Sequence, residues 1–174
     1  MSSAPDFAIA RLGDTALDPL DVGRVVLSAY QSLDGYVPES RYEVQLVDVA
    51  GRAAHSEILV ATDAISGAIL GCATVVTDPA SPMSESFKPG EVGLRMLGVS
   101  PLAQGRGVGR ALVDETISMA RAVTSCTSVV LHSTQYMTAA HGLYERMGFV
   151  REPDLDIDLM DSVGIRLLFF RLRL

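Results

Sequence analysis

Alternating and helical patterns of hydrophobic residues follow one another along the first third of the chain. Residues 7–12 alternate apolar with polar or small side chains, which predicts a strand. Over residues 18–33 the apolar positions recur at spacings of three and four, so this range predicts an amphipathic helix. A second helix is expected to start near Ser40, whose spacing to Glu43 resembles a capping box, and to continue towards Ala50.

The middle of the chain predicts a hairpin followed by a long loop. Residues 58–62 and 68–77 are rich in Ile, Val, Leu and Thr, and the turn-forming residues 63–67 between them predict an antiparallel pair. Residues 78–90 hold prolines, serines and a glycine without a period. They predict a surface loop of the kind that can cover a substrate entrance.

Strands and helices alternate through the second half of the chain. The pattern predicts strands at 91–99 and 128–133, helices at 107–123 and 138–147, and a further strand beginning at Phe149. Residues 151–164 are acidic and lack a regular period, so an irregular segment is expected there. Residues 165–174 are strongly β-forming and predict a C-terminal strand.

Composition and charge narrow the class of protein. With 174 residues, 48% of them apolar, the chain has the size and core material of one domain. We expect this domain to span 1–174, with a flexible N-terminus at 1–6. A net charge of −7 has the wrong sign for binding a phosphate backbone, so nucleic acid is not an expected partner.

No segment has the pattern of a membrane span or a secretory signal. The longest apolar runs, such as 167–170, are far shorter than the roughly 20 residues that cross a bilayer. The first residues also lack a basic stretch followed by an apolar one. Two cysteines without CxxC spacing, Cys72 and Cys126, fit a reducing compartment. The protein is therefore expected to be cytoplasmic, with no membrane partner.

Three glycines, Gly105, Gly107 and Gly109, lie where the strand at 91–99 leads into the helix at 107–123. The first N–H groups of a helix have no intrahelical acceptor, and the helix dipole is positive there. Glycines that admit close approach turn such a helix entry into an anion site, for which a pyrophosphate is the natural guest. The alternative interpretation is a tight strand-to-helix turn without a ligand.

Two common phosphate-binding motifs do not match this segment. A P-loop needs a glycine followed by Lys and then Ser or Thr, and no glycine here has that sequence after it. The dinucleotide fingerprint GxGxxG also fails, because its third glycine would fall on Arg110 or Leu112. The sequence therefore argues against a nucleotide triphosphatase and against NAD binding.

The spacing Gln104-x-x-Gly107-x-Gly109 matches the signature (Gln or Arg)-x-x-Gly-x-(Gly or Ala) of the GNAT superfamily of N-acetyltransferases. The segment at 95–101 is similar to the family's strand lead-in, and Leu-Tyr-Glu-Arg-Met-Gly-Phe at 143–149 resembles its LYExxGF helix. The resemblance covers nearly the whole chain. It implies a mixed α/β (α+β) fold with a mostly antiparallel central sheet, splayed at the motif strand and flanked by helices.

The resemblance implies acetyl-CoA as the cosubstrate. Its pyrophosphate would lie on the backbone amides of the glycine turn, and its pantetheine arm would pair with the motif strand, where the Leu97 amide would face the thioester carbonyl. The cofactor-binding residues so implied are Leu97, Gly98, Val99, Gln104, Gly105, Arg106, Gly107, Val108, Gly109 and Arg110. The side chains of Arg106 and Arg110 either contact phosphates or are solvated surface arginines.

Two catalytic residues follow from the resemblance. Tyr144 matches the family's tyrosine that gives a proton to the departing thiolate, although an aromatic at this helical spacing can also be a core residue. A carboxylate on the motif strand commonly serves as the base, but its usual position holds Gly93. Glu91, on the same strand face, is the base candidate, and the other interpretation is a solvated acid at the strand start.

Several residues depart from the family pattern or allow two interpretations. Met137 stands where many members carry an asparagine that contacts the pantetheine, and Thr138 or Ser133 could replace that contact. His132 and His141 either titrate in the cleft or are structural. Together with His55, these histidines show no metal-ligand spacing, so no metal is expected.

The sequence as a whole predicts an enzyme that moves an acetyl group from acetyl-CoA to a primary amine of a small molecule or peptide. Neither cysteine lies in a nucleophile-like turn, which favours direct attack in a ternary complex. The displaced strand acid leaves a second hypothesis, a non-catalytic acyl-CoA-binding module of the same fold. A protein-interaction domain is a third, and a homodimer through the C-terminal strands is possible.

Overall fold

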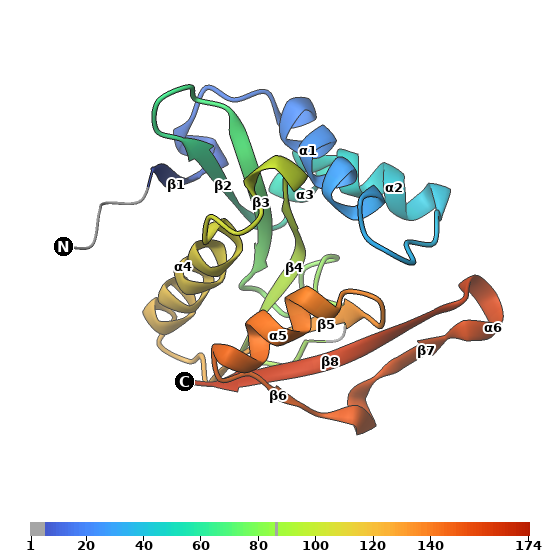
Figure 1. Ribbon diagram of the computed structural model, residues 1–174. Helices are drawn as coiled ribbons and strands as arrows, with labels where there is room; N and C mark the ends of the chain where they lie inside the picture. The colour runs from blue at the N-terminus through green and yellow to red at the C-terminus, as the bar shows by residue number, and fades with distance from the viewer. Residues whose placement is uncertain (1–5, 86) are drawn as a thin grey trace.

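The strands of this protein join one sheet (Figure 1). The computed structural model describes residues 6–85 and 87–174. Its eight-stranded sheet has the order β1-β2-β3-β4-β5-β8-β6, and β7 pairs with β8 beside this path. The strands are β1 (Phe7–Arg11), β2 (Glu57–Asp63), β3 (Ile69–Val76), β4 (Glu91–Val99), β5 (Ser128–Thr134), β6 (Val150–Arg151), β7 (Ile157–Leu159) and β8 (Ile165–Arg173).

Six α-helices connect or flank these strands in the described residues. They are α1 (Pro19–Gln31), α2 (Ser40–Val47), α3 (Val49–Ala53), α4 (Val108–Ala122), α5 (Thr138–Arg146) and α6 (Met160–Val163). Shorter 3-10 turns lie at Leu12–Asp14, Pro101–Ala103 and Pro153–Leu155. Within the described residues, no helix is long and apolar enough to cross a membrane.

The central strands part where the sequence resemblance implied that they would. Every strand pair of the sheet is antiparallel except β4 with β5, which run parallel. Their pairing ends at Leu94 opposite Leu131, although β4 continues to Val99 and β5 to Thr134. The mixed fold with a mostly antiparallel, splayed sheet is thereby confirmed.

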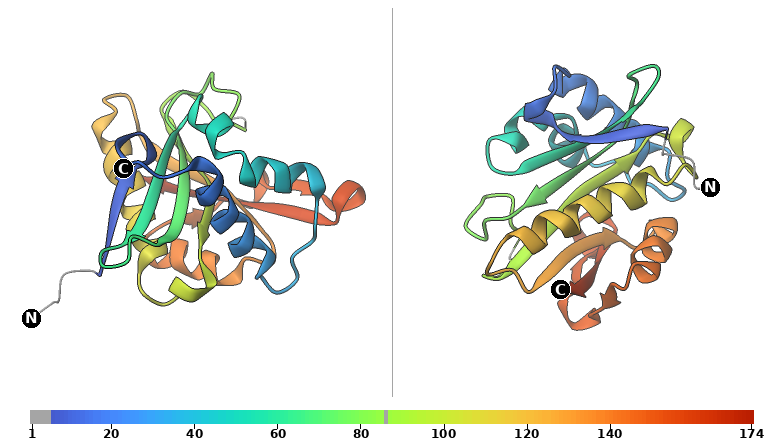
Figure 2. Two further views of the ribbon diagram at one scale, coloured as in Figure 1. Left: turned by 90° about the horizontal axis from the view of Figure 1, so that it is seen from above. Right: turned by 90° about the vertical axis from the view of Figure 1, so that its left-hand side faces the viewer.

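The two larger of three hydrophobic clusters in the described residues cover the two faces of the sheet. Leu59 packs with Leu112 of α4 in one core, and its neighbour Val60 packs with Val26 of α1 in the other. Successive side chains of a strand point to opposite faces, so one strand supplies both cores. In the right-hand view of Figure 2, α4 lies across the strands.

The second predicted helix is shorter than the sequence pattern indicated. Glu39, rather than Ser40, caps α2, and its carboxylate accepts hydrogen bonds from the N–H groups of Arg41 and Tyr42. The helix ends at Asp48, whose backbone leaves the helical region and whose carboxylate accepts from Gly51 N–H to start α3. An interior aspartate that caps a new helix therefore splits the predicted one.

The acidic segment at 151–164 is more regular than predicted. It contains β7 and α6, which form with β8 an arm that extends away from α5 in Figure 1. Ion pairs with arginines hold its carboxylates, such as Asp156 with Arg151 and Asp158 with Arg166. The prediction of an irregular segment was wrong because these partners lie on neighbouring strands. Of the predicted flexible segment 1–6, residues 1–5 lie outside the described residues.

A buried arginine joins the broken helix to the sheet. Arg52 is 3% exposed, and its guanidinium donates to Leu46 O at 2.9 Å, to Gln45 O, and to Thr74 Oγ1 at 3.1 Å. These contacts satisfy two carbonyls at the end of α2, where the helix can supply no partner of its own. Arg52 therefore takes the place of a helix cap.

We expect Arg52→Met to lower the free energy of unfolding by about 2 kcal/mol, because it leaves buried acceptors unpaired. Urea unfolding measures this change. Arg24→Met is the matched control, since Arg24 forms an exposed pair with Asp21 whose loss costs at most about 1 kcal/mol. Equal destabilisation by both variants would contradict the capping role of Arg52.

Candidate active site

The glycine turn opens the N-terminus of α4 to solvent. Gly105 and Gly107 have φ of +79° and +84°, a region that residues with a side chain rarely adopt. Gly107 is the N-cap of α4, and among the described residues no side chain caps this end of the helix. A Cβ placed on either glycine would meet no atom within 4 Å. The first N–H groups of α4 therefore face open space, as an anion site requires.

A cleft of about 480 Å³ lies over this turn, between β4, α1 and α5. All of the predicted cofactor-binding residues except Arg106 line it: Leu97, Gly98, Val99, Gln104, Gly105, Gly107, Val108, Gly109 and Arg110. The side of α1 contributes Ala29, Tyr30 and Leu33, and α5 contributes Met137, Ala139, Ala140, Leu143 and Arg146. One elongated cleft thus joins the glycine turn to the parted strand, and we call it the CoA cleft after the cosubstrate that the sequence resemblance implies.

Arg106 turns away from this cleft. Its Nη2 lies 2.8 Å from a carboxylate oxygen of Asp63 and 2.8 Å from one of Asp6. Hydrogen bonds from Ser66 N–H and from the Arg106 guanidinium hold the pKa of Asp63 well below its usual range. Neither sequence interpretation of Arg106, a phosphate contact or a solvated surface arginine, fits this position. Its side chain instead forms ion pairs that connect the glycine turn to β2. Arg110 lines the cleft and is largely exposed, at 3.5 Å from Asp114.

We expect Arg106→Gln to weaken CoA binding by about threefold, because removal of the charged hydrogen bonds to Asp6 and Asp63 releases the glycine turn from β2. Isothermal titration with CoA measures the effect. Asp63→Asn should weaken binding similarly, since it removes the other end of the same ion pair. Full affinity in both variants would show that the turn holds its shape without this ion pair.

A bulge in β4 exposes the backbone that the pantetheine arm would need. Met96 has φ of +49°, and the four residues of β4 from Arg95 to Gly98 oppose three of β3, from Thr74 to Cys72. Such a bulge leaves an extra residue unpaired and re-aims its neighbours. Beyond it, the edge of β4 that faced β5 has no strand beside it, because β5 has diverged. An extended ligand can pair with this edge as an added strand.

A second cavity, of about 270 Å³, lies on the other side of the parted strands. We call it the acceptor cavity. Tyr30 and Met137 line both the acceptor cavity and the CoA cleft, so the two meet there. Its other lining residues come from α2, β4, β5, the loop at 78–90 and the C-terminal arm, and they include Glu39, Tyr42, Glu85, Arg95, Met96, His132, Ser133, Thr134 and Ile165.

Tyr144 lies in the hydrophobic core and lines neither of the two cavities. Its side chain is 3% exposed and packs against Phe149 and Phe170, with ring centroids 5.7 Å apart in each case. Burial raises the pKa of its phenol well above the usual range. Tyr144 therefore stays protonated at neutral pH, as a proton donor must. Its catalytic role stays a prediction.

Glu91 is held in an ion pair away from both cavities. Its Oε1 lies 2.6 Å from Nη1 of Arg171, and its Oε2 accepts from Lys88 N–H. Glu91 pairs with Ser128 at the start of β4, before the strands part, and it lines neither the CoA cleft nor the acceptor cavity. The predicted role of Glu91 as the base does not fit this position, because a base must reach the attacking amine.

Gly93 stands where the family usually carries the strand acid, and another side chain occupies the space beside it. A Cβ on Gly93 would lie 1.7 Å from Cε2 of Phe87, so the ring from the loop at 78–90 requires a glycine there. Ser133 lines the acceptor cavity rather than the CoA cleft, while Thr138 lines neither. Neither side chain therefore replaces the family's asparagine within the CoA cleft.

Sequence reasoning named His132 but missed the charged cluster that it forms with Glu85 and Arg95 in the acceptor cavity. The Arg95 guanidinium donates to the Glu85 carboxylate and to Met83 O, the latter at 2.9 Å. His132 lies beside Glu85 at 3.7 Å. The three residues come from separate segments without a common motif. The one signal in the sequence was Gly93, which stands where the family usually carries its acid and so indicated that the base lies elsewhere.

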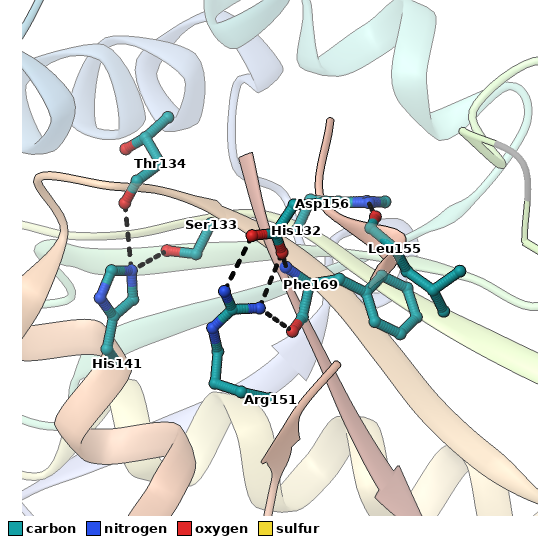
Figure 3. A network of polar contacts seen from close by, with 8 residues as sticks. All are labelled: His132, Ser133, Thr134, His141, Arg151, Leu155, Asp156 and Phe169. Carbon is teal, nitrogen blue, oxygen red and sulfur yellow. Dashed lines mark hydrogen bonds and ion pairs between the residues drawn. The ribbon is translucent and has the colours of Figure 1, made fainter. Parts of the chain in front are cut away.

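His141 is structural. Its Nε2 lies 3.0 Å from Thr134 O and 3.1 Å from Ser133 Oγ, contacts that fix the end of β5 against α5 (Figure 3). No group of three or more metal-binding side chains comes together in the described residues.

Comparison with known proteins places this arrangement in a family. The sequence model of the Acetyltransferase (GNAT) family matches residues 26–149. A mycothiol acetyltransferase from Salinispora tropica is 41% identical over 66 residues, which are 38% of this chain and 21% of that protein. The match thus spans about a fifth of the curated relative's length.

Solved structures share the fold over almost the whole chain. An acetyltransferase of the GNAT family from Desulfovibrio desulfuricans has a TM-score of 0.72 at 24% identity, covering 96% of this chain and 98% of that one. A GNAT family acetyltransferase from Elizabethkingia anophelis with acetyl-CoA bound has a TM-score of 0.68 at 14% identity, covering 98% and 100%. On the family match, the chain belongs to the GNAT acetyltransferase family.

Proposed function

We propose that this protein transfers the acetyl group of acetyl-CoA to a primary amine of a small molecule or peptide. The observation that carries the proposal is the elongated cleft, which joins the open N-terminus of α4 to the unpaired edge of β4. The first can receive a pyrophosphate and the second an extended amide-bearing arm. The relative from E. anophelis, whose structure holds acetyl-CoA, supports the same assignment.

The amine would attack the thioester from the acceptor cavity. Because that cavity meets the CoA cleft at Tyr30 and Met137, an acceptor and acetyl-CoA can be bound together. The Leu97 amide, next to the β4 bulge, is the proposed donor to the carbonyl oxygen on which negative charge develops. Tyr144 is the proposed donor of the proton to the leaving thiolate.

Direct transfer fits the state of the two cysteines. Cys72 is fully buried, and burial raises the pKa of its thiol to about 12, so it is not a nucleophile at neutral pH. Cys126 donates to Ser128 O, and neither cysteine lines the CoA cleft or the acceptor cavity. An acetyl-cysteine intermediate therefore has no support among the described residues.

The second candidate is a module that binds acyl-CoA without catalysis. The ion pair of Glu91 with Arg171 favours it, because this pair removes the only acid predicted on the strand. A thiol-release assay with acetyl-CoA and a panel of amines separates the two. Turnover supports the enzyme, tight CoA binding without turnover supports the module, and the absence of a CoA-induced thermal shift would exclude both.

A further inference from the structure

A histidine with one unpaired nitrogen lies in the acceptor cavity. The His132 side chain is 6% exposed, and its ring packs edge-on against Phe169, with centroids 5.1 Å apart. Nδ1 is buried without a hydrogen-bond partner and lies 3.7 Å from Oε2 of Glu85. Native proteins rarely leave a buried polar atom without a partner, so this one in the acceptor cavity calls for a role.

The other ring nitrogen fixes the tautomer. Nε2 lies 3.4 Å from the carbonyl oxygen of Leu155, as Figure 3 shows. Because a carbonyl can only accept, the proton of a neutral ring resides on Nε2 and the lone pair on Nδ1. The lone pair therefore lies on the side of Glu85, and the carboxylate can stabilise the imidazolium that forms when Nδ1 takes a proton.

The reaction needs such a group. An alkylammonium has a pKa near that of lysine, about 10.4, so most of an aliphatic amine is protonated at neutral pH and cannot attack. Resting on the proposed function, we propose that Nδ1 of His132 accepts the proton of the acceptor ammonium, and that Glu85 and Arg95 are positioning residues for this step. His132 follows Leu131, the last residue of β5 that pairs with β4.

The step balances in atoms and charge. The N–H bond of the ammonium breaks and an Nδ1–H bond forms, which leaves a neutral amine and an imidazolium beside the Glu85 carboxylate. The amine lone pair then forms the C–N bond to the thioester carbonyl. The C–S bond breaks, and the thiolate and the new amide exchange the remaining proton through Tyr144. The imidazolium returns its proton to solvent after the products leave.

The charges around His132 permit this cycle. Burial lowers the pKa of the imidazole, and Arg95 lowers it further, whereas Glu85, the Leu155 carbonyl and Asp156 raise it. The Arg151 guanidinium neutralises Asp156 through a bidentate ion pair, with N–O distances of 2.8 and 2.9 Å. Burial is the largest of these influences, so the ring is neutral at physiological pH and ready to accept a proton.

The other candidate bases in or near the acceptor cavity either serve structural roles or stay protonated at neutral pH. The Glu39 carboxylate caps α2 through two backbone N–H groups. His141 donates to Thr134 O and lines neither the acceptor cavity nor the CoA cleft. Tyr30 and Tyr42, which line the cavity, have pKa values raised mainly by burial, so they are not bases at neutral pH.

A matched pair of amines tests the role of His132. 2-Phenylethylamine is charged at neutral pH, whereas O-benzylhydroxylamine has the same number of heavy atoms and a neutral amine. In His132→Gln we expect kcat/KM at pH 7 to fall about tenfold or more for the first and less than about threefold for the second. The glutamine amide keeps a donor towards Leu155 O, so the arm stays in place. An equal loss for both amines would show a structural role and overturn the inference.

The pH profile supplies an independent readout. In the wild type, kcat/KM for 2-phenylethylamine should fall on the acidic side as His132 becomes protonated. Glu85→Gln should move this limb to lower pH, because the carboxylate raises the pKa of the imidazole. His55→Gln is the matched control, since His55 is exposed and lines neither cavity, and its profile should follow the wild type.

Two outcomes separate the inference from the proposed function. If the wild type turns over these amines and His132→Gln keeps the wild-type profile, the inference fails and the function stands. If the wild type binds CoA but turns over no amine in the panel, the function fails and the inference fails with it.

Discussion

Replacement of Gly107 by valine is expected to raise the dissociation constant of CoA about 100-fold, as measured by isothermal titration calorimetry. Hydrogen bonds from backbone N–H groups to a charged phosphate contribute about 1.5–3 kcal/mol each, and 1.4 kcal/mol is a factor of ten in affinity. Gly107 has φ of +84° and caps α4, so a branched side chain there distorts the turn and crowds the space above the free amides.

Gly67→Val provides the matched control for this prediction. Gly67, in the turn between β2 and β3, has φ of +71° and also has no atom within 4 Å of an added Cβ. Both variants should therefore lose about 1–3 kcal/mol of stability from the same left-handed strain. Gly67 does not line the CoA cleft, so its variant should bind CoA within about twofold of the wild type. Comparable affinity in both variants would remove the glycine turn from CoA binding.

The parts of this protein that were predictable from sequence are those set by local chemistry. The pattern at 91–99 gave β4 with its observed bounds, because alternation reports directly on a strand. The residues from Gln104 to Gly109, except Arg106, line one cleft as the motif predicted, and their role in binding CoA stays a prediction. Arg106 was the exception. Its partners Asp6 and Asp63 are distant in sequence, and a pattern around the turn contains no information about them.

The acceptor cavity could not be predicted because its parts come from separate segments. Glu85 lies in an aperiodic loop with φ of +42°, and Arg95 and His132 lie on strands that meet only in the folded sheet. The same reason explains the error over Glu91. The spacing of Glu91 along β4 matched the strand face expected for the acid. Its carboxylate, however, forms an ion pair with Arg171, which lies 80 residues later in the chain. A long-range ion pair, which no local pattern indicates, therefore fixes where the Glu91 carboxylate lies.

Replacement of Tyr144 by phenylalanine is expected to lower kcat about 100-fold or more, the usual range for loss of a positioned proton donor. The phenyl ring keeps the contacts with Phe149 and Phe170, so the free energy of unfolding and the dissociation constant of acetyl-CoA should change little. Because burial raises the pKa of Tyr144, the phenol stays protonated into the alkaline range. The wild type should therefore show no alkaline loss of kcat from this group below about pH 10.

Steady-state kinetics of Tyr144→Phe, with direct acetyl-CoA titration, tests this expectation. Tyr36→Phe is the control: it also removes one phenol hydroxyl, which donates to Glu43 at 2.9 Å, at a position outside the aromatic cluster of Tyr144, Phe149 and Phe170. Its kcat should stay within about twofold of the wild type, because the hydrogen bond to the Glu43 carboxylate contributes to stability and does not touch the reacting atoms. A Tyr144→Phe protein with wild-type kcat would mean that the thiolate leaves without help from the phenol. The aromatic packing around Phe170 would then be the whole function of this residue.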